Sequence, residues 1–183
     1  MTMHAMAPAD AGGARHLKRG KRMPDLALQT TKGRSVNFAK LSGRSIVYCY
    51  PWTGRPGLPN PPGWDEIPGA HGSTPETEGF RDLYEGFRQV DAAVFGLSTQ
   101  APDQQRELTE RLEVPFELVS DENFLLQRAL ALPTFATGGT VYLRRLTLAL
   151  LNGRIERVYY PVAFPASHAR EICAWLGMID RSH

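Results

Sequence analysis

The residues of this chain that could do chemistry gather in one short segment. Residues 69–82 read GAHGSTPETEGFRD and contain a histidine, a serine and several acids. A serine is a nucleophile only when an adjacent base takes its proton. His71 lies two residues before Ser73 in the same loop, which does not place it reliably as that base, and the G-x-S-x-G pattern is absent. We therefore do not expect a hydrolase pair here.

Ser73 has a simpler structural interpretation. The run Ser73-Thr74-Pro75-Glu76 fits the S-x-x-E capping box, in which the serine hydroxyl accepts a bond from a backbone N–H of the first helical turn. Pro75 is tolerated there because its missing N–H would have no intrahelical partner. The pattern predicts that a helix begins at this serine and that capping is its main physical role.

The two cysteines, Cys49 and Cys173, are too few for a disulfide framework. The five histidines show no pair at metal-ligand spacing, so we predict neither a metal site nor a cofactor. Cys49 lies in the apolar run 46–50, where burial disfavours the reactive thiolate, and we predict a small buried hydrophobe. Cys173 lies on an amphipathic C-terminal segment, where partial burial competes with a role as a resolving or regulatory thiol.

Composition indicates one ordinary globular domain. The chain has 183 residues, of which 42% are apolar and 22% charged, and its net charge is +2. No apolar run is long enough to span a membrane and no signal-peptide pattern occurs, so we predict a cytoplasmic protein without a membrane partner.

Positive charge is concentrated at the N-terminus. Residues 1–22 hold five basic groups and one acid, whereas the rest of the chain holds 16 basic and 18 acidic groups. A nucleic-acid contact would require more charge with interleaved aromatic residues. We predict that residues 1–22 are a disordered basic leader without a nucleic-acid partner, and that residues 23–183 form the domain.

The elements that must position the 69–82 segment alternate between strands and helices. Lys32-Gly33 and Asn152-Gly153 are hairpin turn signals, and Pro102 marks a helix start. Residues 52–72 are rich in proline and glycine and are predicted to form a long functional loop or lid. We predict strands at 26–30, 35–38, 45–50, 92–98, 116–120, 141–151 and 154–161, and helices at 74–90, 102–112, 122–130 and 168–178.

This order predicts an α/β fold, namely a mixed sheet flanked by helices on both faces. An N-terminal hairpin extension followed by alternating elements and a final hairpin and helix is the order of a thioredoxin-like fold. Several short motifs also occur in sequence along residues 23–178. They are IVYCYP at 46–51, PGWD at 62–65, the GA, G, TP and FRD of residues 69–82, GLSTQ at 96–100, LPTF at 132–135, Arg145, and YPV at 160–162.

Together these motifs resemble the peroxiredoxin family, in particular a bacterial subgroup related to the bacterioferritin-comigratory or Q-type peroxiredoxins. The resemblance implies thiol-dependent reduction of hydrogen peroxide and organic hydroperoxides, with thioredoxin or a similar dithiol as reductant. It also allows a homodimer, since peroxiredoxins commonly dimerise. It places Ser73 at the position of the peroxidatic cysteine, with Pro51, Thr74 and Arg145 as further site residues and Glu78 at the resolving position.

The departures from the family pattern bear directly on activity. A serine hydroxyl is protonated at neutral pH and is not oxidised as a thiolate is, so Ser73 cannot replace the missing cysteine. Glu78 removes the second thiol. Ala70 takes the place of a family threonine, for which Thr53 or Thr74 could supply a hydroxyl. We expect peroxidase activity to be absent or impaired in this chain.

Two origins of the serine stay open. Serine is isosteric with cysteine, which favours an engineered Cys→Ser change, whereas the accompanying Ala70 and Glu78 favour natural divergence. The functional alternatives are a redox-dead relative that binds a small anionic ligand or a partner protein, and a repurposed non-redox enzyme that uses the same pocket.

Arg145 provides one further expectation about ligands. Arg144 and Arg145 alternate across a predicted strand, and the resemblance selects Arg145 as the inward one. A buried arginine without a thiolate beside it needs another anion. Glu76, Glu78, a bound carboxylate and a solvent ion are the candidates.

Overall fold

The centre of the molecule is β3 (Arg44–Cys49), which is buried along almost its whole length. Successive side chains alternate between two apolar clusters, one on each face of the sheet. β3 pairs in parallel with β4 (Ala92–Ser98) and antiparallel with β8 (Leu146–Leu151). The predicted central strand at 45–50 is therefore confirmed to within one residue. The computed structural model describes residues 13–178.

A seven-stranded mixed sheet is built around β3. Its order is β2-β1-β5-β4-β3-β8-β9, with β3, β4 and β5 parallel and the outer pairs antiparallel. The thioredoxin-like sheet with an N-terminal hairpin is thus confirmed. The remaining strands are β1 (Leu28–Thr30), β2 (Ser35–Val36), β5 (Glu117–Ser120) and β9 (Arg154–Tyr159).

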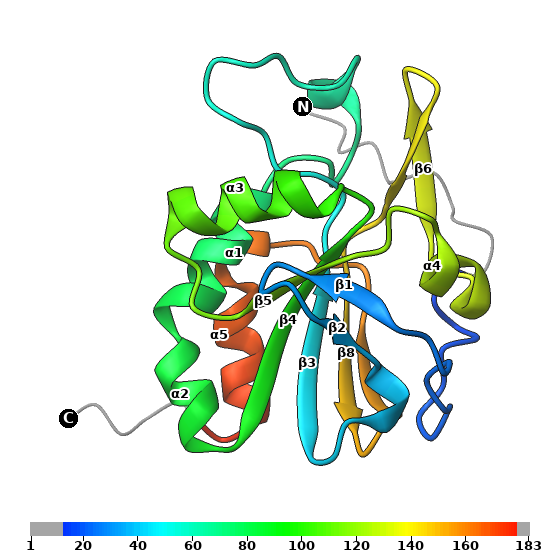
Figure 1. Ribbon diagram of the computed structural model, residues 1–183, viewed down its shortest axis with the longest axis vertical. Coiled ribbons are helices and arrows are strands. Elements are labelled where there is room, and N and C mark those ends of the chain that lie inside the picture. Colours follow the sequence, from blue (N-terminus) through cyan, green and yellow to red (C-terminus); the bar gives the residue numbers. More distant parts are fainter. Residues whose placement is uncertain (1–12, 179–183) are drawn as a thin grey trace, which may run out of the picture.

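Helices cover both faces of this sheet, as predicted (Figure 1). One face carries four helices, and the other carries α4 (Leu125–Leu130) together with the N-terminal segment. The four helices are α1 (Ser73–Asp82), α2 (Tyr84–Gln89), α3 (Pro102–Leu112) and α5 (Pro165–Trp175), and short 3-10 turns lie at Phe38–Lys40 and Trp64–Glu66.

The single helix predicted over 74–90 is wrong, since α1 and α2 meet at Leu83. Backbone bonds continue through the junction, from Leu83 N to the oxygen of Gly79 and from Phe87 N to the oxygen of Leu83. The apolar periodicity is preserved, which is why the sequence pattern does not show the bend. Gly79 and Gly86 lower the helix propensity on either side of it.

The run predicted as one strand over 141–151 is two strands in different sheets. β7 (Thr140–Leu143) pairs with β6 (Thr134–Thr137), which was not predicted, and β8 joins the main sheet. The two are separated at Arg144 and Arg145. Gly138-Gly139 between two threonine-containing runs is the sequence signal of this hairpin.

Two helix starts also differ from the prediction. α4 begins at Leu125, later than predicted, and the Asp121 carboxylate accepts bonds from the N–H groups of Leu126 and Gln127 at 3.0 and 2.9 Å. α5 begins at Pro165, three residues before the predicted start. Proline suits that position because the first helical N–H has no acceptor.

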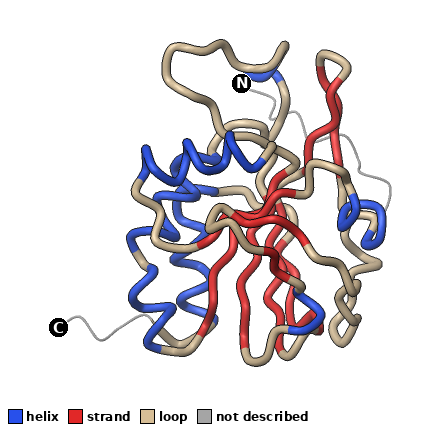
Figure 2. The backbone as a smooth tube through the Cα atoms, in the orientation of Figure 1, coloured by secondary structure: helices blue, strands red, loops and turns tan. Residues whose placement is uncertain are grey.

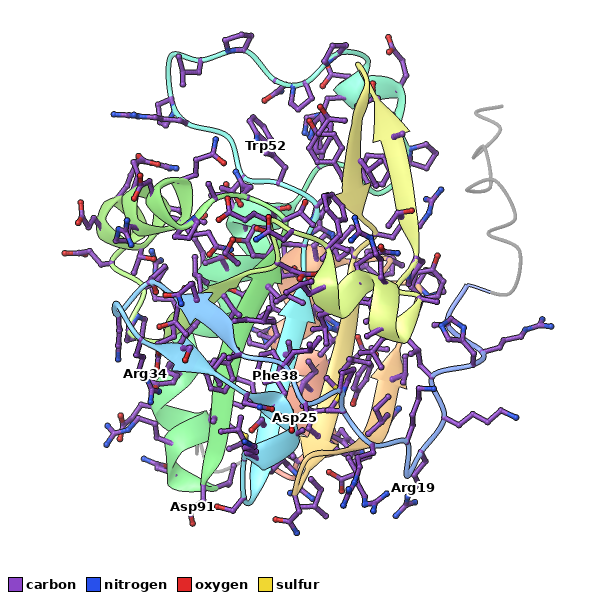
Figure 3. All side chains as sticks on the ribbon, turned by 45° about the vertical axis from the view of Figure 1, so that its right-hand side comes forward. Arg19, Asp25, Arg34, Phe38, Trp52 and Asp91 are labelled. Carbon is purple, nitrogen blue, oxygen red and sulfur yellow. The ribbon has the colours of Figure 1, made fainter. Side chains whose placement is uncertain are left out.

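The N-terminal leader predicted over 1–22 differs from the structure where it is described; residues 1–12 lie outside the described range. Leu17 is only 3% exposed and belongs to a core cluster, and the ring of His16 donates to the carbonyl oxygen of Leu130 at 2.8 Å. The basic side chains stay at the surface, with Arg19 at the opposite end of the molecule from Trp52 (Figure 3). An apolar anchor therefore overrides the disordered composition of residues 13–22.

The proline-rich loop over 52–72 arches over one end of the sheet beside the β6-β7 hairpin (Figure 2). The ring of Trp64 packs against Phe135 and Tyr142, with centroids 5.6 and 5.1 Å apart. These contacts attach the loop to the hairpin. No helix within residues 13–178 is long and apolar enough to cross a membrane.

Candidate functional site

The candidate site lies where β3 ends and α1 begins, beneath the long loop. Pro51 follows the strand and is buried. Ser73 is the first residue of α1, and Gly72 before it has φ of +112°. A Cβ at Gly72 would lie 2.5 Å from Pro165 Cγ, so glycine is required both for the left-handed backbone and for the approach of α5. This geometry fixes Ser73 at the helix N-terminus.

The predicted capping box is wrong. Gly72 is the N-cap, and the Glu76 N–H bonds to its carbonyl oxygen at 3.0 Å. Both side chains of the proposed box turn instead to Arg145, which donates from Nη2 to Ser73 Oγ and from Nη1 to Glu76 Oε1, each at 3.1 Å. A charged donor from the segment between β7 and β8 takes the place of the local capping bonds.

Arg145 is 5% exposed and is the buried member of the arginine pair. Its Nη2 also reaches the carbonyl oxygens of Gly69, Ala70 and His71 at 3.2 to 3.4 Å. The Arg144 side chain instead donates to the Thr134 carbonyl oxygen and lies over the Phe135 ring. Arg145 thus holds the end of the long loop against the first turn of α1.

Of the four candidate anions that the sequence suggests, Glu76 is the one that Arg145 contacts. Its side chain is fully buried, and burial raises the pKa of the carboxyl to about 7 against the lowering effect of Arg145. Glu76 Oε2 and Arg145 Nε have no hydrogen-bond partner among the described residues. An ionised carboxylate with one unpaired buried oxygen is costly, so this glutamate lies close to protonation at neutral pH.

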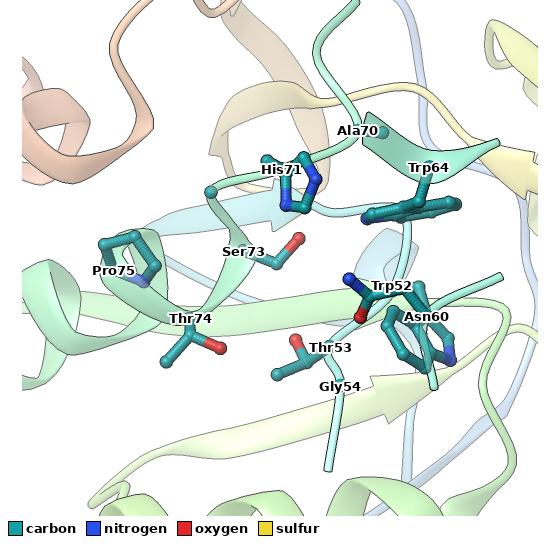
Figure 4. A pocket seen from close by; sticks show the side chains of 11 residues that line it. Trp52, Thr53, Gly54, Asn60, Trp64, Ala70, His71, Ser73, Thr74 and Pro75 are labelled. Atoms are coloured by element: carbon teal, nitrogen blue, oxygen red, sulfur yellow. The ribbon is translucent and has the colours of Figure 1, made fainter. Parts of the chain in front are cut away.

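A cavity of about 250 Å³ opens in front of Ser73 (Figure 4). Thr53, on the opposite wall, is 7% exposed, and its hydroxyl has no partner in the described part of the chain. Its backbone is fixed by reciprocal bonds with the amide of Gln100. The cavity is lined by Trp52, Thr53, Gly54, Asn60, Trp64, Ala70, His71, Gly72, Ser73, Thr74 and Pro75.

The other predicted site positions lie away from this cavity. Glu78 points outward, with its side chain 41% exposed and 3.7 Å from Arg81. Cys49 and Cys173 are both buried in the core clusters. Burial raises the pKa of the Cys173 thiol to about 11 and that of the Cys49 thiol still further. Neither thiol lines the cavity.

His71 lines the cavity and its Nε2 contacts Asp65 Oδ1, although both side chains are largely exposed. No hydrogen bond joins His71 to Ser73 in the described structure. Asp65, Trp52 and Asn60 were not singled out as site residues from the sequence. Their position in the long loop was the signal that could have identified them.

Known proteins resemble this chain in sequence and in structure. Residues 68–149 match the AhpC/TSA family. The chain is 29% identical over 156 residues to a chloroplastic peroxiredoxin Q from Oryza sativa subsp. japonica, covering 85% of this chain and 64% of that relative. It is 30% identical over 111 residues to peroxiredoxin Bcp of Bacillus subtilis (strain 168), covering 60% and 61%.

Solved structures show the same fold. Xanthomonas campestris peroxiredoxin Q superposes with a TM-score of 0.69 at 23% identity, covering 87% of this chain and 96% of that one. The matched family region contains Ser73, Glu76 and Arg145, and it extends from the end of the long loop through β4 and β5 into β8. Together these matches support a relationship of the chain to the peroxiredoxin family, and in particular to its Q and Bcp-type members.

Proposed function

We propose that this chain is a peroxiredoxin-type protein whose pocket binds a small polar ligand without thiol peroxidase chemistry. The observation that carries the proposal is the group facing the cavity at the start of α1, which is the hydroxyl of Ser73. Peroxide reduction of the family type needs a thiolate at that place, with electrons returned by a dithiol such as thioredoxin. The two thiols of the chain are buried elsewhere.

The surroundings of Ser73 support a binding role. The helix N-terminus, the charge of Arg145 and the hydroxyls of Thr53 and Thr74 are groups that would stabilise a thiolate, and all are present around the cavity. Pro51, which follows β3, is also buried. In this proposal Ser73 occupies the peroxidatic position and Glu78 the resolving position, so both sulfur atoms of a two-cysteine cycle are absent.

Peroxide consumption by the natural chain and by Ser73→Cys tests this proposal, with dithiothreitol and a thioredoxin system as reductants. We expect turnover from Ser73→Cys only, because a thiol placed there meets Arg145 and the helix N-terminus. Ser73→Ala is the matched control and should stay inert. Peroxide turnover by the natural chain, lost in a Cys173→Ser variant, would contradict the proposal and move the chemistry to a buried cysteine.

The contact between His71 and Asp65 favours a second candidate, acyl hydrolysis with Ser73 as the nucleophile. His71 would take the serine proton as Oγ attacks the ester carbonyl, and would return it to the alcohol that departs when the ester C–O bond breaks. Water would then hydrolyse the acyl-serine, which releases the carboxylic acid and regenerates Ser73. Turnover of p-nitrophenyl acetate that disappears in both Ser73→Ala and His71→Asn would support it. Equal rates in all three proteins would exclude it.

A homodimer, a dithiol partner and a cytoplasmic location belong to the same proposal. The family supports a peroxide substrate and a thioredoxin-like reductant for members that carry the thiol. The dithiol partner is therefore expected to act only on Ser73→Cys. Sedimentation of the natural chain and of this variant measures the oligomeric state directly.

A further inference from the structure

The hydroxyl groups at the cavity are arranged as donors. An N–H of Arg145 occupies one side of Ser73 Oγ, so the hydroxyl proton is free to point into the cavity that Ser73 lines. The Thr53 hydroxyl is more than nine-tenths buried and has no partner among the described residues. Figure 4 shows the two hydroxyls directed toward the same space. A ligand that fits them must supply acceptor oxygens.

The start of α1 adds positive potential at the same place. The N–H groups of Ser73 and Thr74 lie in the first turn, where a helix offers no intrahelical acceptor, and Pro75 has no N–H. The ten-residue helix therefore directs the positive end of its dipole toward the cavity. Together with the unpaired Thr53 hydroxyl, this end of the helix favours an oxyanion.

Charge balance opposes such a ligand as long as Glu76 is ionised. Arg145 lies between Glu76 Oε1 and Ser73 Oγ, at 3.1 Å from each. An anion at Ser73 and an ionised Glu76 would share this one buried cation, leaving a net negative charge around these buried side chains. When Glu76 is neutral, the positive charge of Arg145 is balanced by the negative charge of the ligand. The unpaired Glu76 Oε2 shows that the carboxylate is not fully satisfied even without a ligand.

We infer that the pocket takes up a small carboxylate together with one proton, which Glu76 accepts. This inference rests on the proposed function and names its ligand class. The ligand oxygens would accept bonds from Ser73, Thr53 and the first turn of α1. The proton would come from solvent and neutralise Glu76, which transfers the charge of Arg145 from Glu76 to the ligand.

The other titratable groups around Glu76 and Arg145 do not change their protonation state near neutral pH. Tyr48, Cys49 and Tyr50 on and after β3 stay neutral because burial raises their pKa values, to about 12 for Tyr50. His168 on α5 stays neutral because burial lowers its pKa, and it bonds to Thr147 and Glu171. The proton is thereby assigned to Glu76. His71 lines the cavity and needs its own control.

Calorimetric titration with sodium acetate between pH 5.5 and 8.5, at fixed ionic strength, tests the inference. We expect a Kd that is constant below about pH 6 and rises by up to tenfold for each pH unit above about pH 7, as one linked proton requires. Two buffers of different ionisation enthalpy should report uptake of about one proton per acetate at pH 8. Acetamide, a neutral analogue, should show no pH dependence.

Variants assign the proton to its residue. Glu76→Gln keeps the acceptor for Arg145 but cannot ionise, so its affinity at pH 8 should equal that of the natural chain at pH 5.5. Glu78→Gln, on the exposed side of the same helix, and His71→Asn should both keep the natural pH profile. Thr53→Val should weaken acetate binding by about tenfold at every pH, the value of one hydrogen bond to a charged group.

Three outcomes would overturn the inference: no acetate binding at pH 5.5, an affinity independent of pH, or a pH profile lost in His71→Asn and kept in Glu76→Gln. If Glu76→Gln does not fold, proton uptake in the two buffers still shows whether the natural chain binds acetate together with a proton. A negative result in the acetate experiments would not affect the peroxide assays of Ser73→Cys. Peroxide turnover by the natural chain would instead defeat the proposed function while acetate linkage could still be observed.

Discussion

Cys49 and Ser73 lie at the two ends of the same connection, one closing β3 and the other opening α1, yet their surroundings are opposite. The thiol is enclosed in an apolar cluster where burial raises its pKa far above neutral. The hydroxyl faces a cavity, a helix N-terminus and a buried arginine. The potentially reactive sulfur is in the inert environment, and the activating environment holds an inert oxygen. We therefore expect reactivity in this fold to depend on the position more than on the residue type.

The largest effect should come from placing a thiol in the activating environment. Iodoacetamide should modify Ser73→Cys faster than either natural cysteine of the folded chain by about three orders of magnitude, because both thiolate fraction and access differ. Mass spectrometry of the native protein measures the site and the rate. A natural chain that is alkylated as fast as the variant would remove the contrast between the two positions.

The two neighbouring arginines allow a matched comparison of stability. Arg145→Met removes the group that lowers the Glu76 pKa, so at pH 8 Glu76 must either stay buried and ionised without a partner or take up a proton. Either cost should lower the free energy of unfolding, by about 3 kcal/mol or more if the charge is kept. Arg144→Met removes a partly buried side chain from the edge of β7 and should cost about 1 kcal/mol. Urea unfolding gives both values. Equal losses of unfolding free energy in the two variants would show that the ion pair of Arg145 with Glu76 contributes no more to stability than the contacts of Arg144.

The pH dependence of stability isolates Glu76. Its pKa is raised on folding from 4.5 to about 7, so the folded state binds the extra proton between these values. Stability should therefore be highest below about pH 4.5 as far as this group is concerned, and fall by on the order of 1 kcal/mol for each pH unit up to about pH 7. The contribution then levels off.

Comparison with Glu76→Gln at each pH isolates this contribution from other groups. The variant should match the natural chain near pH 4.5 and gain on it as pH rises to 7. A difference that stays constant with pH would mean that folding does not shift the pKa of Glu76.

The strands and layers of the fold could be predicted from the sequence because they depend on local periodicity. β4 and α3 begin and end as predicted, since apolar alternation and a proline at a helix start are properties of a few consecutive residues. The junction of α1 and α2 and the separation of β7 from β8 could not be predicted. Both are bends that leave the apolar pattern intact and are set by packing against other elements.

Less of the candidate site than of the fold could be predicted from the sequence. The segment carrying Ser73 and the inward Arg145 follow from a resemblance in motifs, but the role of Glu76 does not. The S-x-x-E pattern favours a local cap, and only a partner 69 residues further along the chain turns both side chains away from it. The position of Thr53 depends on distant contacts in the same way. The sequence could therefore name its hydroxyl as a candidate site group but could not predict that it lies across the cavity from Ser73.

The smallest effect should come from exchanging oxygen and sulfur at the two positions. Cys49→Ser buries a hydroxyl in the apolar cluster that contains Val47, Leu97 and Leu148, and should cost about 1–3 kcal/mol. Ser73→Cys places a sulfur beside Arg145 and an open cavity, where the exchange should change the free energy of unfolding by less than about 1 kcal/mol. Thermal unfolding of both variants, with Cys49→Ala as a volume control, measures the asymmetry. Equal losses of unfolding free energy would contradict the contrast between the apolar surroundings of Cys49 and the open cavity beside Ser73. The start of α1 would then not be a special environment for a sulfur atom.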